Sequence, residues 1–183
     1  VIEALGHQHE KQYFDQYTGL ELEADRAQAA RQGELDFAET LQAWEVRPKA
    51  EAFHRMGRQP FGTRWIDCNK GDDTRVEYRS RLVVQETRKS STIPIDDIAS
   101  VTSSTPPLEV IRLFCSLCMT LRGNNSEKLV MQFLDISPAH PRADVLRDNM
   151  YIEAPKEMAL VEGHCLLLKK CCYGTRDAGQ DFE

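Results

Sequence analysis

The sequence contains no apolar run close to the roughly 20 residues that a membrane-spanning helix needs. Its first residues lack the basic and then apolar pattern of a secretory signal peptide. We therefore expect an intracellular protein, cytoplasmic or nuclear, without a membrane partner. An excess of positive charge is also absent, since the net charge is −6, which argues against a free-standing nucleic-acid binder that relies on charge alone.

What the sequence does contain is an ordinary globular composition, with 41% hydrophobic and 28% charged residues among 183. This composition excludes a chain that is disordered throughout. The length suits one domain or part of a larger one, because domains usually hold roughly 100–200 residues. The chain starts at Val1 and stops at Glu183 inside a helix-like pattern, so we expect a piece of a longer protein.

Six cysteines occur without an export signal, which predicts reduced thiols rather than disulfides. Cys115 and Cys118 form a C-x-x-C pair, and His164 and Cys165 follow downstream, so a zinc-binding regulatory domain is one alternative. The pair lies in an apolar stretch with helical spacing and without the Gly or Pro of a zinc turn. This context favours buried thiols in the core.

Residues 1–60 are predicted to be a lead-in with an amphipathic helix and a connector. A polar, loosely held segment ends at the turn signal Thr18-Gly19. An amphipathic helix is then expected from Leu22 to about Trp44, interrupted or weakened at Gly33. The stretch Arg47 to Pro60 mixes charges, prolines and a glycine without a sustained period, which predicts a connector.

The clearest local prediction is a β-hairpin. Residues 63–68 and 75–84 are β-type runs, and the Gly and Asp residues between them, 69–73, suit a reversal. Arg75, Arg79 and Arg81 alternate along the second run, so they can share one strand face, and that face could meet phosphate. We expect the hairpin to project, with only one face packed.

Further along, Thr105, Pro106 and Pro107 open a helix whose girth is mostly apolar, which predicts a core helix. The apolar run Leu129 to Leu134 has the length of a central strand and ends at Asp135. A carboxylate at the end of a stiff strand can reach solvent and bind a metal ion. The residues alone thus predict an α+β domain with a basic hairpin and one well-placed aspartate.

Six blocks of the sequence follow one another in a recognisable order: Gly62–Ile66, Tyr78–Val84, Thr105–Leu113, Phe133–Ser137, Met150–Pro155 and Leu167–Ala178. Together they resemble the reverse transcriptase domain of copia-type LTR retrotransposon Pol polyproteins, over about two thirds of the chain. The resemblance implies that residues 61–183 are the fingers and the first part of the palm of a right-hand polymerase.

The resemblance also implies roles for particular residues. Asp135 would be catalytic and would bind Mg²⁺, with the backbone carbonyl of Ile136 as a second contact. His140 occupies the position where the family commonly has the Phe or Tyr that rejects a ribose 2′-hydroxyl. Nucleotide or template contacts are implied for Arg79, Arg81, His140, Tyr173, Gly174 and Arg176.

The function implied is RNA-directed DNA synthesis, in which two Mg²⁺ ions lie between carboxylates and the triphosphate. The implied partners are template-primer, dNTP and the rest of the Pol polyprotein, namely the remaining palm, the thumb and RNase H. No Tyr-x-Asp-Asp motif follows Asp135 in this sequence, so we expect the piece to be inactive alone. The alternative is a non-catalytic nucleic-acid-binding or interaction module derived from a retroelement.

Overall fold

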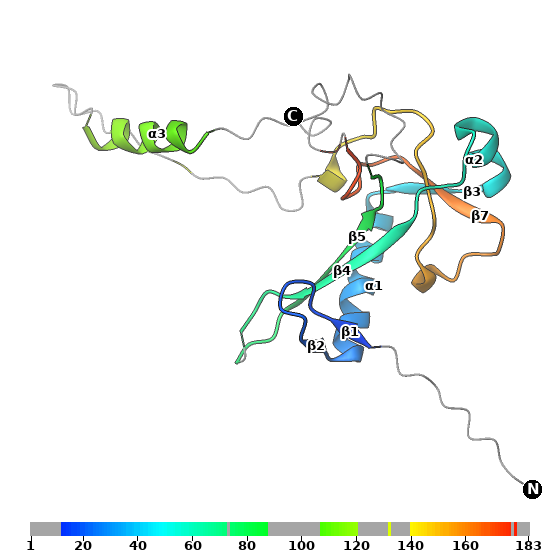
Figure 1. The fold of residues 1–183 in the computed structure, drawn as a ribbon, viewed down its shortest axis with the longest axis horizontal. Coiled ribbons are helices and arrows are strands. Elements are labelled where there is room, and N and C mark those ends of the chain that lie inside the picture. The colour runs from blue at the N-terminus through cyan, green and yellow to red at the C-terminus, as the bar shows by residue number, and fades with distance from the viewer. Residues whose placement is uncertain are drawn as a thin grey trace, which may run out of the picture.

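The computed structural model describes residues 12–72, 74–87, 107–120, 132, 140–176 and 178. Figure 1 shows the helices and short strands that these residues form. In chain order the elements are β1 (Tyr13–Phe14), β2 (Glu21–Leu22), α1 (Ala24–Thr40), β3 (Trp44–Pro48), α2 (Lys49–Met56), β4 (Thr63–Asn69), β5 (Tyr78–Val84), α3 (Leu108–Thr120), η2 (His140–Arg142), β6 (Tyr151–Ile152), η3 (Lys156–Met158) and β7 (His164–Leu168). The mixture of helices with antiparallel strands agrees with the predicted α+β class.

Within these described residues the strands form three small antiparallel sheets: β1-β2, β3-β7-β6 and β4-β5. β3 pairs along the full length of β7, from Trp44 opposite Leu168 to Pro48 opposite His164. The main apolar core lies where the β3-β7-β6 sheet meets the base of the β4-β5 hairpin. Its buried members are Phe61, Val84, Met150, Ile152, Leu166 and Leu168.

The helix predicted after residue 22 is α1, but it differs from the prediction in two ways. Gly33 does not interrupt it, because a single Gly costs only about 1 kcal/mol relative to Ala and packing against β5 outweighs that cost. Ala27 and Leu35 are its buried residues. Trp44 does not extend the helix but begins β3.

The prediction of a connector from Arg47 to Pro60 is wrong. Pro48 ends β3 and caps α2 in an extended conformation, and Gly57 ends α2 with a left-handed φ of 66°. Ala52 of α2 is fully buried against Tyr151 and Cys165. The sequence pattern does not predict β3, because its strand character comes from pairing with β7, more than 100 residues away, rather than from its own alternation.

The lead-in is also more ordered than expected from residue 12 onward. β1 and β2 form a hairpin, and the predicted Thr18-Gly19 turn is present, with φ of 72° at Gly19. The buried carboxylate of Asp15 accepts hydrogen bonds from the backbone N–H groups of Tyr17 (2.8 Å), Thr18 (2.9 Å) and Asn69 (2.7 Å). Asp15 therefore pins this hairpin to the end of β4.

The predicted hairpin at 63–84 is confirmed as β4 and β5, with Thr63 opposite Val84 and Asn69 opposite Tyr78. It extends away from the β3-β7-β6 sheet, as Figure 1 shows. The second strand begins at Tyr78 rather than at residue 75. Gly71 is required in the loop, since a Cβ there would lie 1.8 Å from the carbonyl oxygen of Arg75.

The expectation that only one hairpin face packs is wrong. Ser80 and Leu82 are buried on one face, and α1 packs against β5. Cys68 is buried as well. It is the cross-strand partner of Arg79, so both side chains lie on the other face of the hairpin. Both faces therefore carry buried side chains.

The helix predicted after Pro107 is present as α3, but its predicted burial in the core is wrong. Leu113 and Phe114 are each 59% exposed, and Cys115 is exposed while Cys118 is half-buried. A helix that is apolar around most of its girth is usually buried, so composition alone misplaces this one. The strand predicted at 129–134 lies outside the described residues.

No helix in the described part of the chain combines the length and the apolar character needed to cross a bilayer.

Candidate functional site

Two arginines of β5 form one side of the candidate site. Arg79 and Arg81 lie opposite Cys68 and Ile66 of β4, so they share a strand face, as their spacing predicts. Both are half-buried. The guanidinium carbon of Arg81 lies 4.9 Å from the ring centroid of Tyr173, within cation–π distance. The Arg81 guanidinium is therefore stacked on an aromatic ring rather than fully exposed to solvent.

A carboxylate of α1 lies near this pair. Burial raises the pKa of Glu34, while the positive charges of Arg79 and Arg81 act to lower it. Burial likewise raises the pKa of Tyr173, against the lowering effect of Arg81. Glu34 and Tyr173 thus both belong to the electrostatic surroundings of the β5 arginines.

The turn that carries Tyr173 lies along the edge of β5. The carbonyl of Tyr173 accepts a hydrogen bond of 2.7 Å from the N–H of Val84. Gly174 follows with φ of 86°, and a Cβ at this position would lie 2.2 Å from the carbonyl oxygen of Val84. Gly174 therefore allows the turn to approach the backbone of β5 closely.

A buried ion pair lies just after the end of β5. The two terminal nitrogens of Arg147 donate to the two carboxylate oxygens of Glu86 at 2.7 and 2.8 Å. The backbone N–H of Arg176 donates to Oε2 of Glu86 at 3.0 Å. Neither Glu86 nor Arg147 is among the predicted site residues, and no sequence spacing marks them, since their partnership spans 61 positions.

Nε of Arg81 and Nη1 of Arg176 are buried at this site and have no hydrogen-bond partner among the described residues. A buried donor without a partner is costly, and more so when it is charged. Donors of this kind can form hydrogen bonds with an anion.

The structure thus brings together Arg79, Arg81, Tyr173, Gly174 and Arg176 on β5 and on the turn along its edge. Asp135 and Ile136 lie outside the described residues. The backbone of His140 begins η2.

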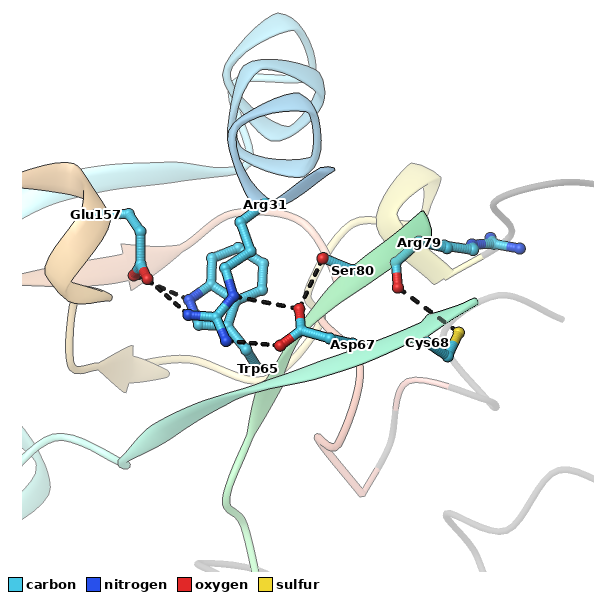
Figure 2. A network of polar contacts seen from close by, with 7 residues as sticks. All are labelled: Arg31, Trp65, Asp67, Cys68, Arg79, Ser80 and Glu157. Carbon is cyan, nitrogen blue, oxygen red and sulfur yellow. Dashed lines mark hydrogen bonds and ion pairs between the residues drawn. The ribbon is translucent and has the colours of Figure 1, made fainter. Parts of the chain in front are cut away.

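A second polar network joins α1 to the hairpin (Figure 2). Arg31 donates to both carboxylate oxygens of Asp67, at 3.2 and 2.6 Å, and to Glu157 at 2.7 Å. Ser80 also donates to Asp67, and the indole N–H of Trp65 donates to Glu157. Arg79 points away from this network in Figure 2, so the two groups are separate.

The charges in the second network support one another. Burial would lower the pKa of Arg31, but its hydrogen bonds to Asp67 and Glu157 outweigh burial and raise it. Burial would raise the pKa of Glu157, but hydrogen bonds from Trp65 and Arg31 lower it. Arg31 and Glu157 therefore both remain ionised near neutral pH, and the network ties α1 to β4 and η3.

The residues of the zinc alternative do not behave as ligands in the described structure. Within it, no three His, Cys, Asp or Glu side chains gather as a metal-binding group. Cys165 is fully buried beside Ala52 and Tyr151, and burial raises the pKa of its thiol. A raised pKa disfavours the thiolate that zinc requires.

Comparison with known families identifies the kind of domain to which these segments belong. The family model described as "Reverse transcriptase (RNA-dependent DNA polymerase)" matches residues 53–183. The chain belongs to this reverse transcriptase family. Members generally bind a template-primer and deoxynucleotides and use Mg²⁺. Neither the curated proteins nor the solved structures gave a match.

The reverse transcriptase match begins inside α2, so α1 and β3 precede it. These preceding elements are nevertheless built into the same fold, since β3 pairs with β7 and Arg31 binds Asp67 and Glu157.

Proposed function

We propose that this chain is the fingers and first palm segment of a copia-type retrotransposon reverse transcriptase, part of a longer Pol polyprotein. In this proposal the β5 arginines and the turn at 173–176 contact the incoming nucleotide or the template. The observation that carries the proposal is the pair of buried arginine nitrogens without acceptors among the described residues, Nε of Arg81 and Nη1 of Arg176, on neighbouring segments of one site.

The chemistry of nucleotidyl transfer fits a phosphate-binding role for these arginines. Catalysis consists mainly of positioning the reactants and neutralising the triphosphate charge. Planar guanidinium groups form paired hydrogen bonds with phosphate, which suits Arg79, Arg81 and Arg176 to binding and orienting it. Tyr173 would hold Arg81 in place by stacking.

Asp135 and the carbonyl of Ile136 would hold Mg²⁺ in this account. The ion supplies charge neutralisation and activates the attacking hydroxyl. His140 would lie near the sugar, where its size and polarity would bear on the choice between ribose and deoxyribose.

The test is primer extension by the complete protein carrying Asp135→Asn. We expect extension to fall by several orders of magnitude while template-primer binding is retained, because the substitution removes one metal-binding charge and leaves the β5 arginines intact. Asp144→Asn is the matched control, since Asp144 is an exposed carboxylate paired with Lys170. Near-normal extension by Asp135→Asn would refute its assigned role. Template-primer binding without extension by the wild-type protein would instead favour the non-catalytic module.

A further inference from the structure

Glu86 is the meeting point of three segments that are distant in the sequence. It lies two residues beyond the end of β5, its side chain is fully buried, and its partner Arg147 is 19% exposed. The third segment is the turn at 173–176, which reaches the same carboxylate through the backbone N–H of Arg176. One side chain therefore joins β5, the 140–150 region and the candidate binding turn.

Both carboxylate oxygens of Glu86 accept hydrogen bonds. Oε1 accepts from Nη1 of Arg147, and Oε2 accepts from both Nη2 of Arg147 and the N–H of Arg176. The paired contact with Arg147 fixes the plane of the carboxylate. A fixed carboxylate plane in turn fixes where the N–H of Arg176 must lie.

The same turn has a second attachment, which is made to backbone atoms of β5. Val84 donates to the carbonyl of Tyr173 at 2.7 Å, and the thiol of Cys172 donates to the carbonyl of Leu82 at 3.4 Å. These contacts hold the beginning of the turn. Glu86 holds its end, so Tyr173 and Arg176 are attached to β5 from both sides.

We propose that Glu86 is a positioning residue for nucleotide or template binding, holding the turn at 173–176 so that Tyr173 and Arg176 lie beside Arg81. This inference rests on the proposed function, because it assumes that these three residues face a phosphate. Arg147 serves to orient Glu86 and to neutralise its buried negative charge.

The first experiment compares Glu86→Gln with the wild-type protein. Gln has nearly the same shape but only one acceptor oxygen, because its NH₂ group is a donor. Arg147 therefore no longer makes its paired contact, and the Arg176 N–H no longer has a charged acceptor. We expect amide hydrogen exchange at Arg176 to become about tenfold faster, on the scale of one hydrogen bond to a charged group. The matched control is Glu45→Gln, a partly exposed carboxylate paired with Arg47 and Lys169.

The second readout is affinity for a fluorescently labelled RNA–DNA template-primer and for dTTP. We expect about five- to tenfold weaker binding by Glu86→Gln and unchanged binding by Glu45→Gln, since only the first releases the turn. Circular dichroism should show the same helix and strand content in both variants. Unchanged exchange at Arg176, or unchanged affinity despite faster exchange, would overturn the proposal.

A double substitution separates positioning from simple ion pairing. Glu86→Arg with Arg147→Glu restores an opposite-charge pair but removes the Glu86 acceptor of the Arg176 backbone N–H, because a guanidinium accepts no hydrogen bond. We expect the double variant to recover thermal stability relative to Glu86→Arg alone and to keep the weakened binding. Recovery of binding together with stability would show that Glu86 is only a structural partner.

Binding by the wild-type protein tests the proposed function, whereas the difference between wild type and Glu86→Gln tests the role of Glu86. If the wild-type protein bound neither probe, the proposed function would fail, and the binding half of this inference would fail with it. Exchange at Arg176 would still show whether Glu86 holds the turn. If the wild-type bound both probes and Glu86→Gln bound equally well, the function would stand and the role of Glu86 would be refuted.

Discussion

Arg31 and Asp67 form a two-contact ion pair, at 3.2 and 2.6 Å, between helix α1 and strand β4. Asp67 is 6% exposed, so the pair is largely shielded from water. Arg31 lies before the segment that matches the reverse transcriptase family, and Asp67 lies within it. The orientation of the hairpin therefore depends on a residue that the family match does not include.

Replacing Arg31 tests this dependence. Arg31→Met would leave Asp67 and Glu157 buried without their cation, so we expect a decrease of about 3 kcal/mol in the free energy of unfolding. Arg26→Met in the same helix removes an exposed pair with Glu23 and should cost about 0–1 kcal/mol. Urea unfolding of both variants measures the difference, and equal decreases would contradict a structural role for the Arg31 network.

Asp15 should make the fold sensitive to acid. Three backbone N–H donors, with Asn69 the strongest, lower the pKa of Asp15 from 3.8 to about 2. Because the pKa is lower in the folded chain, the carboxylate stabilises the fold above about pH 4, and this stabilisation is lost as the pH falls toward 2. We expect its contribution at neutral pH to be about 2 kcal/mol.

The measurement is the free energy of unfolding of Asp15→Asn between pH 7 and pH 2. The variant should be less stable at pH 7, and its stability should fall less steeply than that of the wild type below pH 4. Asp36→Asn, at a position in α1 away from this hairpin, provides the control. Parallel pH curves for wild type and Asp15→Asn would show that Asp15 has no special role.

Gly174 and Gly163 allow backbone strain to be separated from steric conflict. Both have a left-handed φ, 86° and 82°, but only at Gly174 would a Cβ meet another atom, the Val84 carbonyl oxygen at 2.2 Å. Gly163→Ala should cost about 1 kcal/mol from strain alone. Gly174→Ala should cost clearly more and should shift the turn away from β5.

Thermal unfolding of the two Gly variants gives the comparison, and amide exchange at Val84 reports whether the turn has moved. Equal destabilisation with unchanged exchange at Val84 would mean that the turn does not need its close approach to β5.

The hairpin could be predicted from the sequence because its signals are local. The alternation of Arg79 and Arg81, together with the reversal around Gly71, is contained within about 20 residues. The Thr18-Gly19 turn was predictable for the same reason.

Other features depend on partners that are distant in the sequence. β3 needs β7 to become a strand, and Glu86 needs Arg147 to become buried. α3 shows the opposite kind of error. Its apolar composition predicts a buried helix, but its large apolar side chains are exposed. Periodicity reports what a segment can bury, whereas the tertiary fold determines whether a surface is present to bury it.

The salt dependence of template-primer binding tests the central claim most directly. Arg79→Gln with Arg81→Gln should weaken binding and reduce the slope of log affinity against log salt concentration by about one for each phosphate that is no longer bound. Arg26→Gln with Arg47→Gln changes the net charge equally at ion-paired positions outside the candidate site and should leave the slope unchanged. An unchanged slope for the Arg79 and Arg81 variant would contradict a phosphate-binding role for β5.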